Sequence, residues 1–584
     1  MVRMINLQSN LKMRRLKIMK DINELTYLLK KSRLKLGFGL IVLAIASYNA
    51  NAQGGLQTYS AIPDYNGYSS SMYSVQVREV DSEGASLTEY ESNHTYYLES
   101  IAKNGADRMS HSHWTTFSFG PTGSSKMVEV EVSMQSGSIS NYEFRPTHVH
   151  NISQSGGKLT FQIESNKYTA IIINGDIRNP LFIFADPVET NVPDSNGESV
   201  YVVEKGSTTK EAPLTIRDIG DKKIIYFEKG EHFINETDAF GYTPQSYNSA
   251  FFVCSNSGSR CEGNQIEQIY IPGGAIVHGN IRATRAHNLM VNGRGIIEGQ
   301  DTYGAAEEGK GGGADYFSGQ ILNSAVTMAA YRHKMTDTRP TTMNQVVEGV
   351  TSILARKYNF QLGIGAIVRN TKSFAHRQTT DGIGVEENSR VSTNFMKVND
   401  DALKLYQDNT VFENSYIWHQ MNGAAMQLGW DKEEGDSITV TNTYILHDDM
   451  YQAKYFNEGF WANQSIICWL KHFENFDHTR EGIVIDGINS NNMPEVGVIR
   501  LIAIAMDGEM GGSGLGNLDM TLKNINVGAE DEDTPSYVGC ADARTCKVEF
   551  INCKRAGVYM DASNVPARGN TAGVTITSDL AEKP

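Results

Sequence analysis

Residues 268–299 read QIYIPGGAIVHGNIRATRAHNLMVNGRGIIEG and carry the clearest signal of the architecture. Short aliphatic runs alternate with Gly and Asn about every six to eight residues. This spacing is too short for helices and typical of strands joined by tight turns. Such a strand cannot bury its apolar face alone, so it must stack on similar units. The stretch therefore predicts a repetitive all-β region.

Similar strand–Asn–strand segments return at 412–417, 440–445, 522–527 and 550–555. Imperfect repeats of about 20–30 residues, each with three short strands, predict a right-handed parallel β-helix over residues 214–584. Asn side chains at equivalent turns are expected to form a hydrogen-bonded ladder along the stack. A second β-sandwich is the alternative, because strand spacing alone does not exclude it.

The region from residue 53 to residue 213 has a different pattern. Eight short alternating strands follow one another at about ten-residue spacing, and the last is SVYVVE at 199–204. This pattern predicts a β-sandwich, and the region holds no concentration of catalytic residue types. The expected fold class is therefore all-β, an N-terminal β-sandwich followed by a parallel β-helix that carries the catalysis.

Residues 1–52 predict a secretory signal peptide. A long basic segment precedes the apolar run LGFGLIVLAIA at 36–46 and the small-residue cleavage pattern Ala50-Asn51-Ala52. Because the apolar run is short for a membrane span, we expect a secreted protein, extracellular or periplasmic, with no stable membrane insertion. An uncleaved N-terminal membrane anchor is the alternative.

The composition excludes two other classes. The chain has 584 residues, a formal net charge of -15 and 40% hydrophobic residues. An acidic protein does not suit nucleic acid as a partner, because phosphate binding requires a basic surface. The hydrophobic fraction is enough to bury a large core, so the chain is not intrinsically disordered.

The cysteines suit an exported protein, in which disulfides are possible. Cys254 and Cys261 flank a polar loop that they can close, and Cys540, Cys546 and Cys553 offer a second local pair whose choice stays open. Cys468, in the apolar context SIICWL, is expected to be a free core thiol. Because no cysteine or histidine cluster has zinc spacing, we predict neither a metal nor another cofactor.

Residues 378–406 concentrate the acidic chemistry. Asp381 lies in a turn, and Asp400 and Asp401 follow about 20 residues later, close to one β-helix coil. Since one coil rises by about 4.8 Å, the three carboxylates are expected to cluster on one exposed face. Their repulsion would keep one protonated beside two bases, as glycoside hydrolysis requires. The alternative is that the Asn-Asp-Asp run caps a turn.

Aromatic and polar side chains follow within about two coils and are candidates for sugar binding. Indole rings stack on sugars, and amide and imidazole groups hydrogen-bond sugar hydroxyls. Core packing or, for the lysine, a structural salt bridge is the alternative for each. The candidates are Lys404, Tyr406, Trp418, Gln427, Trp430 and His447.

The order of these motifs resembles glycoside hydrolase family 49, which contains dextranases and isopullulanases. The resemblance lies in TDG at 380–382, VNDDALKLY at 398–406, IW at 417–418 and QLGW at 427–430. The family's layout, a sandwich and then a β-helix, is also the one expected here. The resemblance is strong over residues 375–450 and extends more weakly over most of the mature chain.

The resemblance implies an inverting endo-hydrolase of α-glucans. Asp400 would be the general acid that protonates the glycosidic oxygen, and Asp381 and Asp401 would position and deprotonate the attacking water. The stretch after Asp381 and residues 421–425 depart from the family pattern near the expected sugar subsites. Dextran is therefore the first expected substrate, pullulan or another α-glucan the second and an algal galactan the third.

Two other classes compete with a hydrolase. A polysaccharide lyase on the same scaffold would need a group that neutralises a uronate carboxylate, and the R-I-K motif of the related polygalacturonases is absent from the sequence. A carbohydrate-binding β-solenoid without turnover is the other class. The expected partner is a polysaccharide substrate, and the expected state is a monomer.

Overall fold

The computed structural model describes most of the chain after residue 54. The described residues are 55–81, 83–100, 110–122, 126–234, 250–254 (backbone only), 266–283, 286–299, 325–328, 344–355, 358–376, 380–420, 422–429, 435–449, 465–470, 480–489, 500–505, 517–528, 535–542 and 544–579. The predicted signal peptide lies outside them. None of the described helices is long and apolar enough to cross a membrane.

Two five-stranded sheets form the N-terminal sandwich. The strands are β1 Tyr73–Glu79, β2 Glu91–Asn93, β3 Tyr96–Leu98, β4 Ser112–Ser118, β5 Met127–Met134, β6 Tyr142–Arg145, β7 Val149–Ser155, β8 Lys158–Glu164, β9 Lys167–Ile173 and β10 Leu181–Asp186. One sheet has the order β2-β1-β5-β8-β7 and the other β3-β4-β10-β9-β6. A common core that includes Val130, Phe161 and Ile183 lies between them, because alternate residues of each strand point inward.

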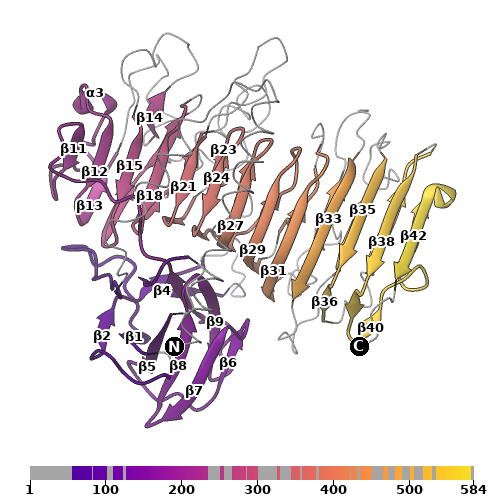
Figure 1. Cartoon of the computed structure of the whole chain (residues 1–584), viewed down its shortest axis with the longest axis horizontal. Coiled ribbons are helices and arrows are strands. Elements are labelled where there is room, and N and C mark those ends of the chain that lie inside the picture. The colour runs from indigo at the N-terminus through magenta and orange to yellow at the C-terminus, as the bar shows by residue number, and fades with distance from the viewer. Residues whose placement is uncertain are drawn as a thin grey trace, which may run out of the picture. The chain divides into compact units, whose positions relative to one another are not determined.

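The later strands pair almost entirely in parallel, as a β-helix requires. The larger sheet holds β11 Val200–Val203, β12 Ile224–Phe227, β13 Gly230–Phe233, β15 Gln268–Ile271, β16 Ala275–His278, β18 Met290–Gly293, β19 Ile296–Glu298, β21 Val346–Glu348, β22 Thr351–Ile353, β24 Ile367–Arg369, β25 Lys372–Phe374, β27 Arg390–Lys397, β29 Val411–His419, β31 Thr439–Asp448, β33 Arg480–Asn489, β35 Leu518–Lys523, β36 Asn526–Val527, β38 Cys546–Ile551, β39 Lys554–Arg555, β40 Val558–Tyr559 and β42 Val574–Asp579. Figure 1 shows these strands stacked in sequence order from β13 to β42.

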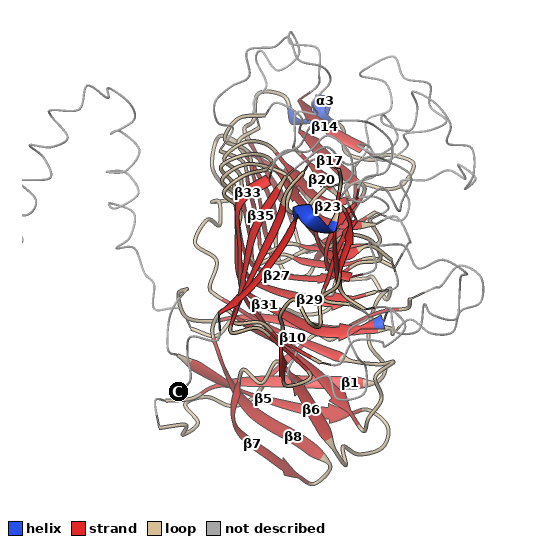
Figure 2. Cartoon of the chain, turned by 90° about the vertical axis from the view of Figure 1, so that its right-hand side faces the viewer, coloured by secondary structure: helices blue, strands red, loops and turns tan. Residues whose placement is uncertain are grey.

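A second parallel sheet contributes one further strand to each coil. It holds β14 Ala250–Cys254, β17 Asn280–Ala283, β20 Val326–Thr327, β23 Tyr358–Leu362, β26 Asp381–Val385, β28 Leu403–Lys404, β30 Ala424–Gln427, β32 Ser465–Leu470, β34 Ile502–Ala505, β37 Tyr537–Cys540 and β41 Ala567–Gly569. The short helix α3 Ile216–Ile219 and the 3-10 turn η4 Thr571–Gly573 are the described helical elements, and strands dominate Figure 2. This arrangement confirms the predicted all-β class with a parallel β-helix.

One predicted strand belongs to a different layer. The segment SVYVVE was expected to end the sandwich, but β11 pairs in parallel with β12, Val200 opposite Ile224. An alternating valine pattern suits either layer, so the sequence does not show which partner the strand takes. The parallel sheet thus starts before residue 214. The boundary between a sandwich at 53–213 and a β-helix at 214–584 stays a proposal.

Stacked side chains hold the coils together. Ile383, Leu403, Met426 and Ile467 lie in register on successive strands and are fully buried, so each covers its neighbours. At the bends of the larger sheet, asparagines adopt positive φ angles, and the Asn442 amide donates to Asn414 Oδ1 at 3.4 Å. The predicted asparagine ladder is confirmed.

The sandwich packs on the β-helix through a buried, largely aromatic contact. The ring centroids of Trp114 and Phe374 lie 4.5 Å apart, and those of Phe182 and Phe395 lie 4.7 Å apart. Buried charges accompany these rings. Asp186 of β10, which is fully buried, forms an ion pair with Lys372 of β25. The two layers therefore meet as one core rather than as a polar domain interface.

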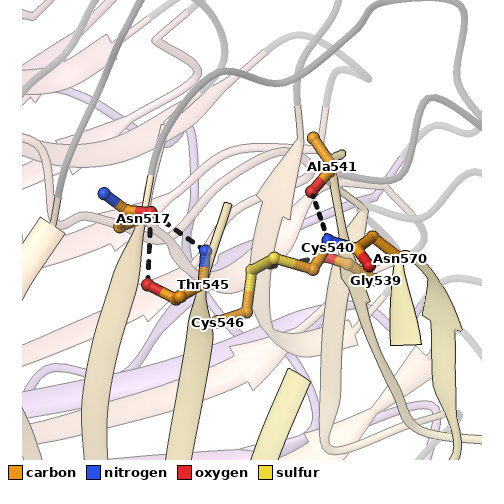
Figure 3. Close-up of a disulfide and its surroundings, with 7 residues drawn as sticks. All are labelled: Asn517, Gly539, Cys540, Ala541, Thr545, Cys546 and Asn570. Atoms are coloured by element: carbon orange, nitrogen blue, oxygen red, sulfur yellow. Dashed lines mark hydrogen bonds between the residues drawn. A yellow bond between two sulfur atoms is a disulfide. The ribbon is translucent and has the colours of Figure 1, made fainter. Parts of the chain in front are cut away.

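One of the open cysteine pairings is resolved. Cys540 and Cys546 form a disulfide that joins the end of β37 to the start of β38 (Figure 3). Cys553 and Cys468 are buried and form no disulfide with a described cysteine, as predicted for Cys468. The Cys254–Cys261 pairing lies outside the part of the chain whose side chains are described.

Candidate active site

Three carboxylates meet where two neighbouring coils enter the second sheet. Asp381 is the first residue of β26, and Asp400 and Asp401 form the turn before β28. One carboxylate oxygen from each of the three lies within 4.8 Å of the others. The spacing of one coil thus brings them together, as the sequence predicts. The expected common exposed face is wrong in part, because Asp381 and Asp401 are buried, 3% and 1% exposed, and Asp400 alone is partly exposed.

Two glycines permit this close approach. A Cβ on Gly382 would lie 2.2 Å from the carbonyl oxygen of Ala402, and a Cβ on Gly423 would lie 2.3 Å from the carbonyl carbon of Asp400. Gly423 also has a φ of +77°, which favours glycine. Beside it, the Ala424 N–H donates to Asp401 Oδ1 at 3.0 Å. The turn that carries Asp400 and Asp401 is therefore fixed from the next coil.

Lys404 lies inside the carboxylate cluster. Its Nζ is 2.8 Å from Asp401 Oδ2 and 3.2 Å from Asp381 Oδ1. Burial alone would lower the pKa of Lys404, but the two carboxylates raise that pKa well above its usual value. The salt bridge that is the alternative to sugar binding for Lys404 is therefore present, and it involves two carboxylates. Aspartate oxygens are also ligands for hard cations, but here an ammonium already supplies the positive charge between two of the three.

Two tyrosines flank the lysine. Lys404 Nζ donates to Tyr406 Oη at 3.2 Å, and its Nζ lies 5.4 Å from the ring centroid of Tyr358. Tyr406 is half-buried and was a sequence candidate. Tyr358 was missed. It pairs with Asp381 from the preceding coil, so counting back one repeat of 23 residues from Asp381 would have found it.

Gln427 lies in the same row as Lys404, one strand further on. Its side chain is fully buried and its next neighbour in the row is Cys468. The structure therefore places Gln427 next to Lys404 in the sheet, with its side chain buried below the surface of the candidate site. Trp430, the other candidate of this coil, lies outside the described residues.

Trp418 and His447 lie elsewhere, and their prediction as substrate contacts needs correction. Trp418 is fully buried, its ring 5.3 Å from that of Phe182 in the sandwich, so no sugar could stack on it. His447 is 2% exposed, with its Nδ1 3.3 Å from Arg145 Nη1 and its Nε2 3.0 Å from Asp449 Oδ1. Both belong to the larger sheet, which faces the sandwich, and the motif order could not show this.

Known proteins resemble the chain over much of its length, although no family model matches it. It is 24% identical over 321 residues to a dextranase from Arthrobacter globiformis, covering 53% of this chain and 46% of the relative. It is 21% identical over 506 residues to an isopullulanase from Aspergillus niger, covering 81% of this chain and 76% of that protein. The chain spans about half the length of the dextranases that it matches.

A solved structure shares the fold. Dex49A from Penicillium minioluteum superposes with a TM-score of 0.63 at 17% identity, over 90% of this chain and 99% of that one. The β-helix and its preceding sandwich therefore recur in a protein whose sequence has diverged widely. The chain is therefore similar in sequence to dextranases and to an isopullulanase, and it shares the fold of Dex49A.

Proposed function

We propose that the protein is a secreted endo-hydrolase of a neutral α-glucan, with dextran as its first substrate. The observation that carries the proposal is the cluster of Asp381, Asp400 and Asp401 around Lys404. Glycoside hydrolysis needs one acid and one base on either side of the scissile bond, and this cluster offers both in one turn. The dextranase relatives support the substrate class.

The three aspartates differ in surroundings in a way that suits different roles. Asp400 is the partly exposed member, so a sugar can reach it, and we assign to it protonation of the glycosidic oxygen. Asp381 and Asp401 share the Lys404 ammonium, which offsets their negative charge and fixes their oxygens. They would position the attacking water and take its proton. Lys404 and Tyr406 would hold this pair in place.

The stereochemical course is part of the proposal, and the family resemblance implies inversion. Carboxyl groups usually lie about 6.5–9.5 Å apart in inverting enzymes and about 5–5.5 Å apart in retaining ones. In this chain, 4.8 Å is the upper limit on the distances between one oxygen of each carboxylate, which is a different quantity from the separation of whole carboxyl groups. Proton NMR of the first product is the direct test. Inversion predicts a β-anomer from an α-linked chain, and an initial α-anomer would contradict it.

Pullulan is the second candidate substrate, because the isopullulanase match covers the largest share of the chain among the curated relatives. A reducing-sugar assay on dextran, pullulan, nigeran, agarose, carrageenan and polygalacturonate separates the possibilities. We expect release from dextran. Release from pullulan alone or from a galactan alone would keep the reaction and change the substrate. No release of reducing sugar from any of these polymers would favour a carbohydrate-binding solenoid.

We also propose export after cleavage near Ala52, action outside the cell and a monomeric state. N-terminal sequencing of the secreted protein should then begin near Gln53. Light scattering should give the mass of one chain. Retention of the full N-terminus in a membrane fraction would support the anchor instead.

A further inference from the structure

Gly384 stands at an open position on the outer side of the second sheet. Its neighbours Ile383 and Val385 point into the core of the β-helix, so a side chain at position 384 would point outward. A Cβ built there would meet no atom of the described residues within 4 Å. The glycine itself is nevertheless buried. The described part of the chain therefore leaves the space above Gly384 unfilled.

Nothing in the local backbone explains why this residue is glycine. Its φ is not positive, unlike that of Gly423, so other residues could adopt the same conformation. Glycine within a strand costs stability and often marks a place where a ligand approaches the backbone. The neighbouring Gly382 differs, because its Cβ would collide with Ala402.

Two long side chains border the open position. Gly384 pairs with Gln361 on one side and with Lys404 on the other, each one strand spacing of about 4.8 Å away. The Lys404 ammonium turns toward Asp381 and Asp401, which places the catalytic cluster at this edge of the space. At the opposite edge, Gln361 Oε1 is buried and has no hydrogen-bond partner among the described residues.

We infer that the space over Gly384 is a sugar-binding subsite beside the catalytic carboxylates, and that the Gln361 amide hydrogen-bonds a hydroxyl of that sugar. The inference rests on the proposed function and adds a subsite to it. A buried amide oxygen without a partner is costly in the free protein, and a bound hydroxyl would satisfy it. Because a hydroxyl both donates and accepts, it suits either orientation of the amide.

The charges indicate a neutral sugar at this subsite. Lys404, the cation that borders the space, already pairs with two carboxylates. Its charge is therefore compensated before any substrate binds, and a uronate carboxylate would meet the net negative charge of the cluster. The ligand class is a neutral hexose unit within an oligosaccharide.

Substitution of Gly384 tests the subsite. Gly384→Ala and Gly384→Val should fold with the wild-type melting temperature or a slightly higher one, since no described atom lies in the way. Their side chains would fill the space, so KM for dextran should rise, by about tenfold or more for valine, with kcat little changed. Gly382→Ala, two residues away, is the matched control and should lower the melting temperature.

Two variants of Gln361 test whether its side-chain amide binds the sugar. Gln361→Leu keeps the size of the side chain but cannot bind a hydroxyl, and it should raise KM by about tenfold. Gln361→Glu retains the acceptor and should recover part of the affinity. A wild-type KM in both Gly384→Val and Gln361→Leu, or a lower kcat with unchanged KM, would overturn the subsite.

Calorimetry with isomalto-oligosaccharides separates this inference from the proposed function. Turnover of dextran is not needed to see binding, so the two can fail independently. Binding to the wild type and at least tenfold weaker binding to Gly384→Val would support the subsite even if no hydrolysis were found. Equal affinity of the two proteins, or no binding to the wild type, would overturn it.

Discussion

Two buried lysines of one coil show how differently the two sides of the β-helix are built. Lys397, at the end of β27, donates to the carbonyl oxygens of Ser110 and His111 in the sandwich, each at 2.6 Å. Lys404, on β28, pairs with Asp381 and Asp401. Burial lowers the pKa of Lys397 to about 7, whereas the carboxylates raise the pKa of Lys404 well above its usual value. The neutral partners of Lys397 belong to a structural contact, whereas the charged partners of Lys404 belong to the candidate active site.

The aromatic residues follow the same division. On the sandwich side, Trp418 and Phe395 are buried in the contact. On the carboxylate side, Gly384 leaves unfilled space next to Lys404 among the described residues. The buried rings hold the two layers together, and the unfilled position is where the proposed subsite lies. The following changes would test this contrast.

The largest effect is expected on the carboxylate side. Lys404→Met leaves Asp381 and Asp401 buried without their shared cation, which should cost about 3–5 kcal/mol of stability and lower kcat on dextran about a hundredfold. Denaturant unfolding and initial-rate kinetics measure both.

Lys372→Met is the matched control. It removes another buried lysine, one that pairs with Asp186 of the sandwich. Stability should fall, while kcat per folded molecule should stay within about twofold of the wild type. If both variants lost kcat alike, the contrast between the two sides would be wrong.

Trp418→Ala should act on stability alone. Removing a fully buried indole from the sandwich contact should cost about 3–5 kcal/mol, and Trp418→Phe much less. KM and kcat of the folded fraction should not change. A raised KM without loss of stability would instead support Trp418 as a substrate contact.

Lys397 predicts a smaller, pH-dependent effect. Because its folded-state pKa of about 7 lies below the ordinary lysine value, the unfolded chain binds more protons above pH 7. Burial causes this shift, and Asp449 opposes it. The free energy of unfolding should therefore rise with pH from about 7 to about 10, by at most about 1.4 kcal/mol per unit from this group. Urea unfolding between pH 6.5 and 9 measures it.

The Lys397→Met variant isolates this contribution from those of His111 and the other titrating groups. Its stability should depend less steeply on pH than that of the wild type over the same range. Identical pH dependence in the two proteins would show that Lys397 does not titrate there.

Repeat length made most of the fold predictable. The 20-residue interval from Asp381 to Asp401 fixed which residues would meet, because one coil advances by one strand spacing. The partner of the segment at 199–204 was not predictable, since alternating valines suit a sandwich and a β-helix equally. The same holds for Trp418, whose ring type fits a sugar or a core, and only the packed sandwich decides between them.

Gln361 and Gly384 show a different limit. Their significance depends on an unpartnered oxygen and an unfilled volume, and neither is visible in residue order. In the sequence, a glycine within GIGV indicates only an interruption of a strand, and a single glutamine belongs to no recognisable motif. Register against Lys404 gives both a place beside the carboxylates.

The most direct test of the account is the pair of turnover and binding measurements on Asp400→Asn. This change keeps the shape of the side chain and removes its ability to act as an acid. We predict that dextran hydrolysis falls by about 10²–10⁴-fold while the melting temperature and the affinity for isomalto-oligosaccharides stay close to wild type. Hydrolysis at the wild-type rate would contradict the assignment of the carboxylate cluster as the active site.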